Sequence, residues 1–94
     1  MLITERLKII GRRVQELRRD RNKTQAELAE MADLSTNYVG EIERGETQAT
    51  LETLLRIADA LEVNPSNLFV PLDRPESRVE TIARIRELLD RLSE

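Results

Sequence analysis

Apolar residues recur at intervals of three and four along the whole of this chain, and no segment alternates apolar with polar residues. This spacing places apolar side chains on one face of an α-helix, whereas a half-buried strand needs a period of two. We therefore expect an all-α fold. The expected helices cover about residues 4–21, 24–31, 35–44, 50–61, 65–69 and 75–92.

Capping residues mark the ends of several of these helices. Thr24, followed by Glu27 three positions later, has the pattern of a capping box. Ser35 is a favoured N-cap residue, and Gly45 is a favoured residue just beyond a helix end. The second and third helices are therefore separated only by about residues 31–35, which is a very short connection.

Each expected helix has an apolar face that we expect to be buried. The residues expected to face inward in the first helix are Ile3, Leu7, Ile10, Val14 and Leu17, and those in the fourth are Leu51, Leu54, Leu55, Ala58 and Leu61. The sequence VPLDRPE at residues 70–76 has two prolines and indicates a boundary. We expect a five-helix domain over residues 1–70, and a linker with a C-terminal helix over residues 71–94.

Composition argues against several classes of function. The 94 residues include no cysteine and no histidine, so the commonest metal ligands and general bases are absent. We expect no enzyme, no metal site and no cofactor. No apolar run approaches the roughly 18 residues of a membrane-spanning helix, and no signal-peptide pattern opens the chain, so a cytoplasmic protein without a membrane partner is expected.

The net charge of −3 argues by itself against nucleic acid, but the charges are unevenly distributed. Basic residues predominate between Arg6 and Lys23, and acidic residues predominate between Glu41 and Glu62. A basic helix face is more often a solvated surface than a DNA contact. Phosphate contact from this run is therefore the less favoured interpretation, with Arg18 and Lys23 its best candidates.

Two short helices joined so tightly, the second with a polar outer face, form the pattern of a helix-turn-helix. The segments TQAELA, IERGE and LLRIADALEV occur in an order and spacing that resemble the Cro/phage-repressor (XRE-type) helix-turn-helix family over about residues 9–69. The resemblance implies a five-helix bundle whose third helix enters the major groove. It also implies a homodimer that binds double-stranded DNA as a transcriptional regulator, most simply a repressor on a two-fold operator.

The resemblance assigns expected roles to individual residues. The base-facing positions are Thr36, Asn37, Gly40 and Glu41. The phosphate contacts that the resemblance implies are Gln25, Arg44, Thr47 and Gln48. Lys23, from the basic run, and Tyr38, through its hydroxyl, are further expected phosphate contacts. Arg18 and Glu43 match a structural ion pair between the first and third helices. For Glu41, a solvated charge that repels phosphate is as good an interpretation as a contact to cytosine; for Tyr38, a core role is as good as a phosphate contact.

The sequence departs from the family pattern in two ways, and it has one glycine inside the expected third helix. Asp33 occupies the turn position where the family usually has glycine, and no Arg or Lys lies among the leading base-facing residues, so the common bidentate contact to guanine is missing there. Gly40 is an interior helix glycine, which costs roughly 1 kcal/mol relative to alanine. We interpret it as an exposed position that lets the helix backbone lie deeper in the groove; a neutral surface substitution is the alternative.

The C-terminal helix has an apolar stripe formed by Ile82, Ile85, Leu89 and Leu92, and we expect this stripe to mediate dimerisation. Folding back onto the first domain is the alternative. For the whole protein, the alternative function is an antitoxin or adaptor that uses the same fold to bind a protein partner, because the chain is acidic and its expected DNA-facing helix has few arginines.

Overall fold

The computed structural model describes residues 2–70 and 75–92, and the described part is entirely helical, which confirms the expected fold class. The elements are α1 (Ile3–Asp20), α2 (Gln25–Ala32), α3 (Thr36–Glu43), α4 (Leu51–Ala60), the 3-10 helix η1 (Pro65–Leu68) and α5 (Pro75–Leu92). The short fifth helix of the expected bundle is therefore a 3-10 turn, with Asn64 as its N-cap and Pro65 in its first turn.

The helix ends form where the capping residues predict them. At α2 the Thr24 hydroxyl accepts a hydrogen bond from the Glu27 N–H (3.1 Å), while the Thr24 N–H donates to Glu27 Oε1 (3.0 Å). The hydrogen bond from the Thr24 N–H to the carboxylate, with a smaller contribution from the Thr24 side chain, holds the pKa of Glu27 below its usual value. At α3 the Ser35 hydroxyl accepts from the Tyr38 N–H, and Gly45 follows the helix with φ +71°.

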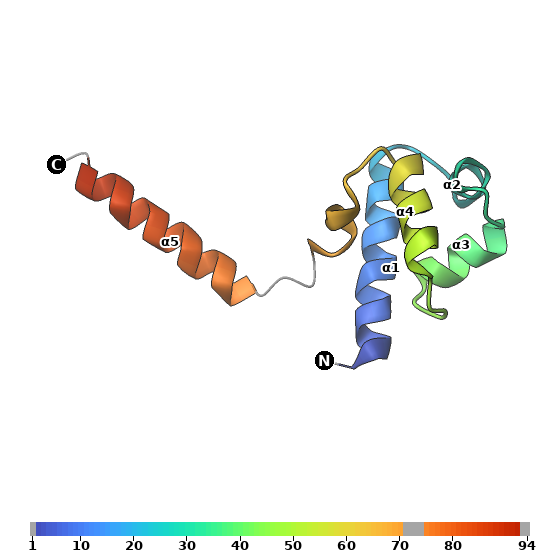
Figure 1. Cartoon of the computed structure of the whole chain (residues 1–94), viewed down its shortest axis with the longest axis horizontal. Coiled ribbons are helices and arrows are strands. Elements are labelled where there is room, and N and C mark those ends of the chain that lie inside the picture. Colours follow the sequence, from blue (N-terminus) through green and yellow to red (C-terminus); the bar gives the residue numbers. More distant parts are fainter. Residues whose placement is uncertain (1, 71–74, 93–94) are drawn as a thin grey trace.

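The core lies where α1, α2, α3, α4 and η1 meet. In Figure 1, α2 and α3 lie together at one end of the molecule. α3 packs on α1 and α2, α2 packs on α4, and η1 packs on α1 and α4. The largest fully buried side chains are Val14, Leu28, Val39, Ile57, Leu61 and Leu68. All of the described core therefore falls between residues 14 and 68.

The buried face of α4 differs from the expected one. Leu51 and Leu55 were expected to face inward, but they are 68% and 41% exposed, while Ile57 and Thr53 are buried. Apolar residues occupy more than half of the circumference of this helix, so spacing alone could not identify the sector that meets α2 and η1. Ile3 was also expected inside and is 59% exposed, because it lies at the first residue of α1, beyond the core.

α1 and α3 approach closely at Gly11. A Cβ built on Gly11 would overlap the carbonyl oxygen of Ile42 and lie 2.6 Å from that of Glu43. Backbone atoms cannot move aside as a flexible side chain can. Gly11 therefore lets the backbone of α1 rest directly against the end of α3.

α5 stands apart from the other helices in Figure 1. Ile85, Leu89 and Leu92 are 51%, 59% and 83% exposed, and Leu88 beside them is 51% exposed. Ile82, the remaining residue of the expected dimerisation stripe, lies outside the residues whose side chains the structure describes. None of the described helices is both long and apolar enough to cross a membrane.

Candidate nucleic-acid interface

The turn between α2 and α3 contains only residues 33–35. Asp33 has φ 57° and ψ 48°, the left-handed conformation for which glycine is usual and Asp is among the better-tolerated substitutes. The Leu34 N–H donates to the Ala29 carbonyl (2.8 Å), which closes the end of α2. This geometry fixes α3 against α2 and completes the helix-turn-helix.

A buried ion pair connects α1 to α3. Arg18 Nε donates to Glu43 Oε2 (2.7 Å) and Arg18 Nη2 to Glu43 Oε1 (3.0 Å), so the contact is bidentate, and both residues are 7% exposed. The hydrogen bonds that Arg18 donates to the Glu43 carboxylate raise the pKa of Arg18. The pair expected between these two residues is thus present, and Arg18, enclosed in it, is not available for a phosphate.

The same ion pair positions the start of α2. Gln25 Nε2 donates to Glu43 Oε1 (3.1 Å), and Arg18 Nη1 donates to the Lys23 carbonyl (2.8 Å). Lys23 and Gln25 are both half-buried. Glu43 therefore holds the side chain of Gln25 at the junction of α2 and α3, next to the outer face of α3.

The outer face of α3 begins with Thr36 and Asn37, which are both exposed. Asn37 Nδ2 donates to Glu41 Oε1, one turn further along, at 3.2 Å. This bond orients the Asn37 amide along the helix surface. Glu41 is half-exposed, and Tyr38, on the adjacent side, is half-buried and packs against the core.

Gly40 does not lie open on this face, contrary to the expectation from the sequence. It is buried, because the side chains of Arg44 and Gln25 cover it: a Cβ at residue 40 would lie 2.9 Å from Arg44 Nη1 and 3.6 Å from Gln25 Oε1. The helix backbone at Gly40 is therefore shielded, so the expected exposure of this residue is wrong, while its approach to DNA stays a prediction.

The end of α3 and the following loop contribute the remaining expected contacts. Arg44 is exposed, and its Nε donates to Glu46 Oε1 (2.9 Å). Gln48 is exposed and Thr47 half-buried. The structure thus brings Gln25, Asn37 and Arg44 to the surface around α3, each hydrogen-bonded to a glutamate.

Two basic residues, one in α1 and one just after it, make contacts inside the domain. Arg13 Nε donates to the Asn67 carbonyl (2.9 Å) and holds η1 against α1. Arg21 Nη2 lies 3.4 Å from the Glu62 carbonyl, beyond the end of α4. These contacts favour a structural role for Arg13 and Arg21 within the basic run.

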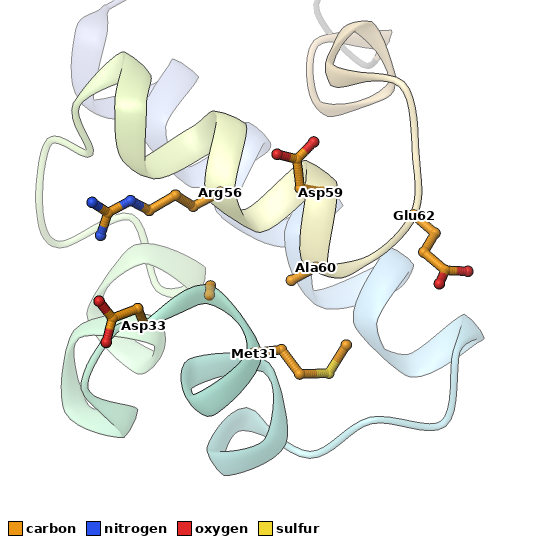
Figure 2. Close-up of a pocket in the computed structure, with 7 residues that line it drawn as sticks. Met31, Asp33, Arg56, Asp59, Ala60 and Glu62 are labelled. Atoms are coloured by element: carbon orange, nitrogen blue, oxygen red, sulfur yellow. The ribbon is translucent and has the colours of Figure 1, made fainter.

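A groove of about 600 Å³ lies between the end of α2 and the end of α4. In Figure 2, Asp33 and the end of Arg56 lie on one side, Glu62 lies on the other, and Met31 and Ala60 lie between them. Asp59 adds a third carboxylate to the lining, and Met31 is 50% exposed. Three carboxylates would repel phosphate, so this groove does not suit the DNA backbone.

The family model described as Helix-turn-helix (HTH_3) matches residues 14–68, which contain the whole described core and α3. This chain belongs to the helix-turn-helix family. The resemblance inferred from TQAELA, IERGE and LLRIADALEV is therefore confirmed.

Relatives of this helix-turn-helix protein include phage and bacterial regulators. It is 40% identical over 57 residues to the immunity repressor protein of Bacillus phage phi105, a match covering 61% of this chain and 40% of the repressor. It is 35% identical over 66 residues to the uncharacterized HTH-type transcriptional regulator y4dJ of Sinorhizobium fredii (strain NBRC 101917 / NGR234), covering 70% and 86% of the two chains. The chain thus spans less than half the length of the phage repressor.

The fold is also shared with a solved structure, the restriction-modification controller protein C.AhdI from Aeromonas hydrophila. The TM-score is 0.67 at 38% sequence identity, and the match covers 67% of this chain and 96% of C.AhdI.

Two residues of this helix-turn-helix domain were missed by the sequence interpretation. Gly11 is an interior helix glycine like Gly40, so the same reasoning applied to Gly11 would have identified the close approach of α1 to α3. Glu46 lies after the end of α3, so helical periodicity could not place it. The left-handed conformation of Gly45 turns the chain and places Glu46 beside Arg44.

Proposed function

We propose that this protein is a sequence-specific DNA-binding transcriptional regulator, most simply a repressor, that acts as a homodimer on double-stranded DNA. The observation that carries the proposal is the outer face of α3, where Thr36 and Asn37 are exposed. The side chains of Gln25 and Arg44, which can donate hydrogen bonds to phosphate, lie over Gly40 of the same helix. An α-helix with its side chains is about 10–12 Å in diameter, and a B-DNA major groove is about 12 Å wide. α3 therefore fits the groove.

Affinity and discrimination would come from different residues. Gln25, Arg44 and Gln48 would contact phosphates, which position the protein without carrying sequence information. Asn37 would contact adenine N6 and N7 through its amide, already oriented by Glu41 at 3.2 Å. The names of the relatives support this function, since one is an immunity repressor and another a transcriptional regulator.

The homodimer is proposed to form through α5. A helix of 18 residues is only marginally stable alone in water, and Ile85, Leu88 and Leu92 are at least half exposed within one chain. Pairing with the same helix of a second copy would bury these side chains and create a two-fold axis. Such a dimer suits two half-sites about 34 Å apart on one face of DNA.

Selection of binding sites from random duplexes tests the proposal. The full chain should enrich a sequence with two inverted half-sites, and the enriched duplex should bind more tightly than a scrambled one at moderate salt. Failure of the folded protein to enrich any sequence would contradict the proposed function.

A second candidate function is a protein-binding module, and the groove between α2 and α4 favours it. The half-exposed Met31 beside Asp33, Asp59 and Glu62 would suit a basic segment with aliphatic side chains. The selection experiment separates the two functions, because a module that binds only protein enriches no duplex.

A further inference from the structure

Three side chains of the proposed DNA-binding surface are each hydrogen-bonded to a glutamate: Gln25 to Glu43, Asn37 to Glu41, and Arg44 to Glu46. The third pair differs from the others, since Glu46 lies outside α3, in the loop that follows it. Both members of this pair have side chains that are 54% exposed. Glu46 can therefore move away from Arg44 without disturbing the core.

Arg44 lies in a defined position on the surface of α3. Its guanidinium is folded back over Gly40, with Nη1 2.9 Å and Cζ 3.7 Å from the point a Cβ of residue 40 would occupy. Gln25 Oε1 lies 3.6 Å from the same point. Two groups suited to phosphate, from α2 and from the end of α3, thus converge over one glycine.

Glu46 is held beside this guanidinium by its backbone. The Glu46 N–H donates to the Glu41 carbonyl (2.9 Å) after the turn at Gly45, so the loop is tied to α3. The hydrogen bond between the side chains raises the pKa of Arg44 and lowers that of Glu46. The contact therefore favours the charged form of both groups, which are charged at neutral pH at their ordinary pKa values as well.

We propose that Glu46 competes with DNA phosphate for Arg44 and thereby lowers the affinity of this protein for DNA of any sequence. The inference rests on the proposed function and adds a residue that sets binding strength. Arg44 Nε donates to Glu46, so a phosphate that accepts from the same N–H must displace the carboxylate.

The energetics suit a competitor better than a structural ion pair. Exposed ion pairs contribute little to folding, so displacing Glu46 costs little stability. The attraction between opposite unit charges about 4 Å apart in water corresponds to a roughly fivefold change in affinity, and a phosphate that displaces Glu46 from Arg44 must offset this attraction. The buried Arg18–Glu43 pair, in which both residues are 7% exposed, cannot be exchanged in this way.

The test compares Glu46→Gln with the wild-type full chain, using the selected duplex and a scrambled duplex of the same length. Glutamine keeps the size of the side chain and removes its charge. Glu46→Gln should bind both duplexes about fivefold more tightly, with a salt dependence steeper by about one released ion. Glu52→Gln is the matched control, because Glu52 also forms an exposed pair with an arginine, Arg56, at 2.8 Å on α4. It should bind as the wild type does.

A double variant separates competition for Arg44 from a general effect of charge. Adding Glu46→Gln to Arg44→Gln should give no further gain, because the contested guanidinium is already gone. An equal gain with and without Arg44, or no gain in the single variant, would overturn the inference while the proposed function stands. A folded wild-type chain that binds neither duplex would overturn both.

Discussion

Gly11 and Gly40 both lie inside helices, yet their surroundings are opposite. At Gly11 a Cβ would meet the backbone of α3, whereas at Gly40 the nearest atoms are the ends of the flexible side chains of Arg44 and Gln25. Backbone atoms resist displacement and side-chain ends yield. The two glycines therefore have different physical roles despite the same local cost to helix propensity.

Replacing each glycine with alanine tests this difference in surroundings. Gly11→Ala should destabilise the fold by about 1–3 kcal/mol or more, because the added methyl separates α1 from α3. Gly40→Ala should raise stability by up to about 1 kcal/mol, reduced by the small shift of Arg44. Urea denaturation of both variants measures the two changes. A Gly11→Ala variant as stable as the wild type would contradict the close packing of α1 on α3.

Asn37 and Gln25 should have separable effects on DNA binding. Asn37→Ala should reduce preference for the selected base at its position by about 1–3 kcal/mol, because the bidentate amide is lost. Gln25→Ala should weaken binding to all sequences alike, because phosphates carry no sequence information. Competition binding with single-base substitutions of the selected site measures both effects. An unchanged base preference in Asn37→Ala would assign the discrimination to other residues.

At the scale of elements, Glu43 joins three helices. It accepts from Arg18 of α1 and from Gln25 of α2, and it is itself the last residue of α3. Removing its carboxylate would leave the buried guanidinium of Arg18 without a negatively charged partner. The orientation of α3 relative to α1 and α2 therefore depends on this one side chain.

Glu43→Ala should lower the free energy of unfolding by about 3–5 kcal/mol, because an uncompensated charge remains buried. Glu52→Ala, which breaks an exposed pair on α4, should lower it by less than about 1 kcal/mol. Thermal and urea denaturation of the two variants compare them directly. Equal, small losses would mean that the Arg18–Glu43 pair is solvated rather than buried.

The sequence predicted where the helices begin and end better than it predicted which side of each helix is buried. The N-caps Thr24 and Ser35 and the stop at Gly45 depend on local hydrogen bonds and backbone conformation, so they could be identified from a few neighbouring residues. Which side of α4 is buried depends on helices that are distant in the chain. The burial of Gly40 depends on the long side chains of Arg44 and Gln25, which fold over it. Local periodicity contains no information on either.

At the scale of the whole molecule, the described core ends at Leu68, and α5 follows as a separate amphipathic helix. Deleting residues 73–94 should therefore leave the core intact. The shortened protein should be a folded monomer that binds a single half-site weakly. Sedimentation at low micromolar concentration measures its mass. A truncated protein that remains dimeric would place the interface elsewhere, for example at the exposed Leu51, Leu55 or Phe69.

The central claim is that phosphate contacts supply the affinity and α3 supplies the discrimination. The most direct measurement is the dissociation constant of the full chain for the selected and the scrambled duplex, between about 50 and 200 mM salt. Both affinities should fall steeply with salt, while the selected duplex keeps its advantage throughout. Equal affinities for the two duplexes across this range would contradict the claim.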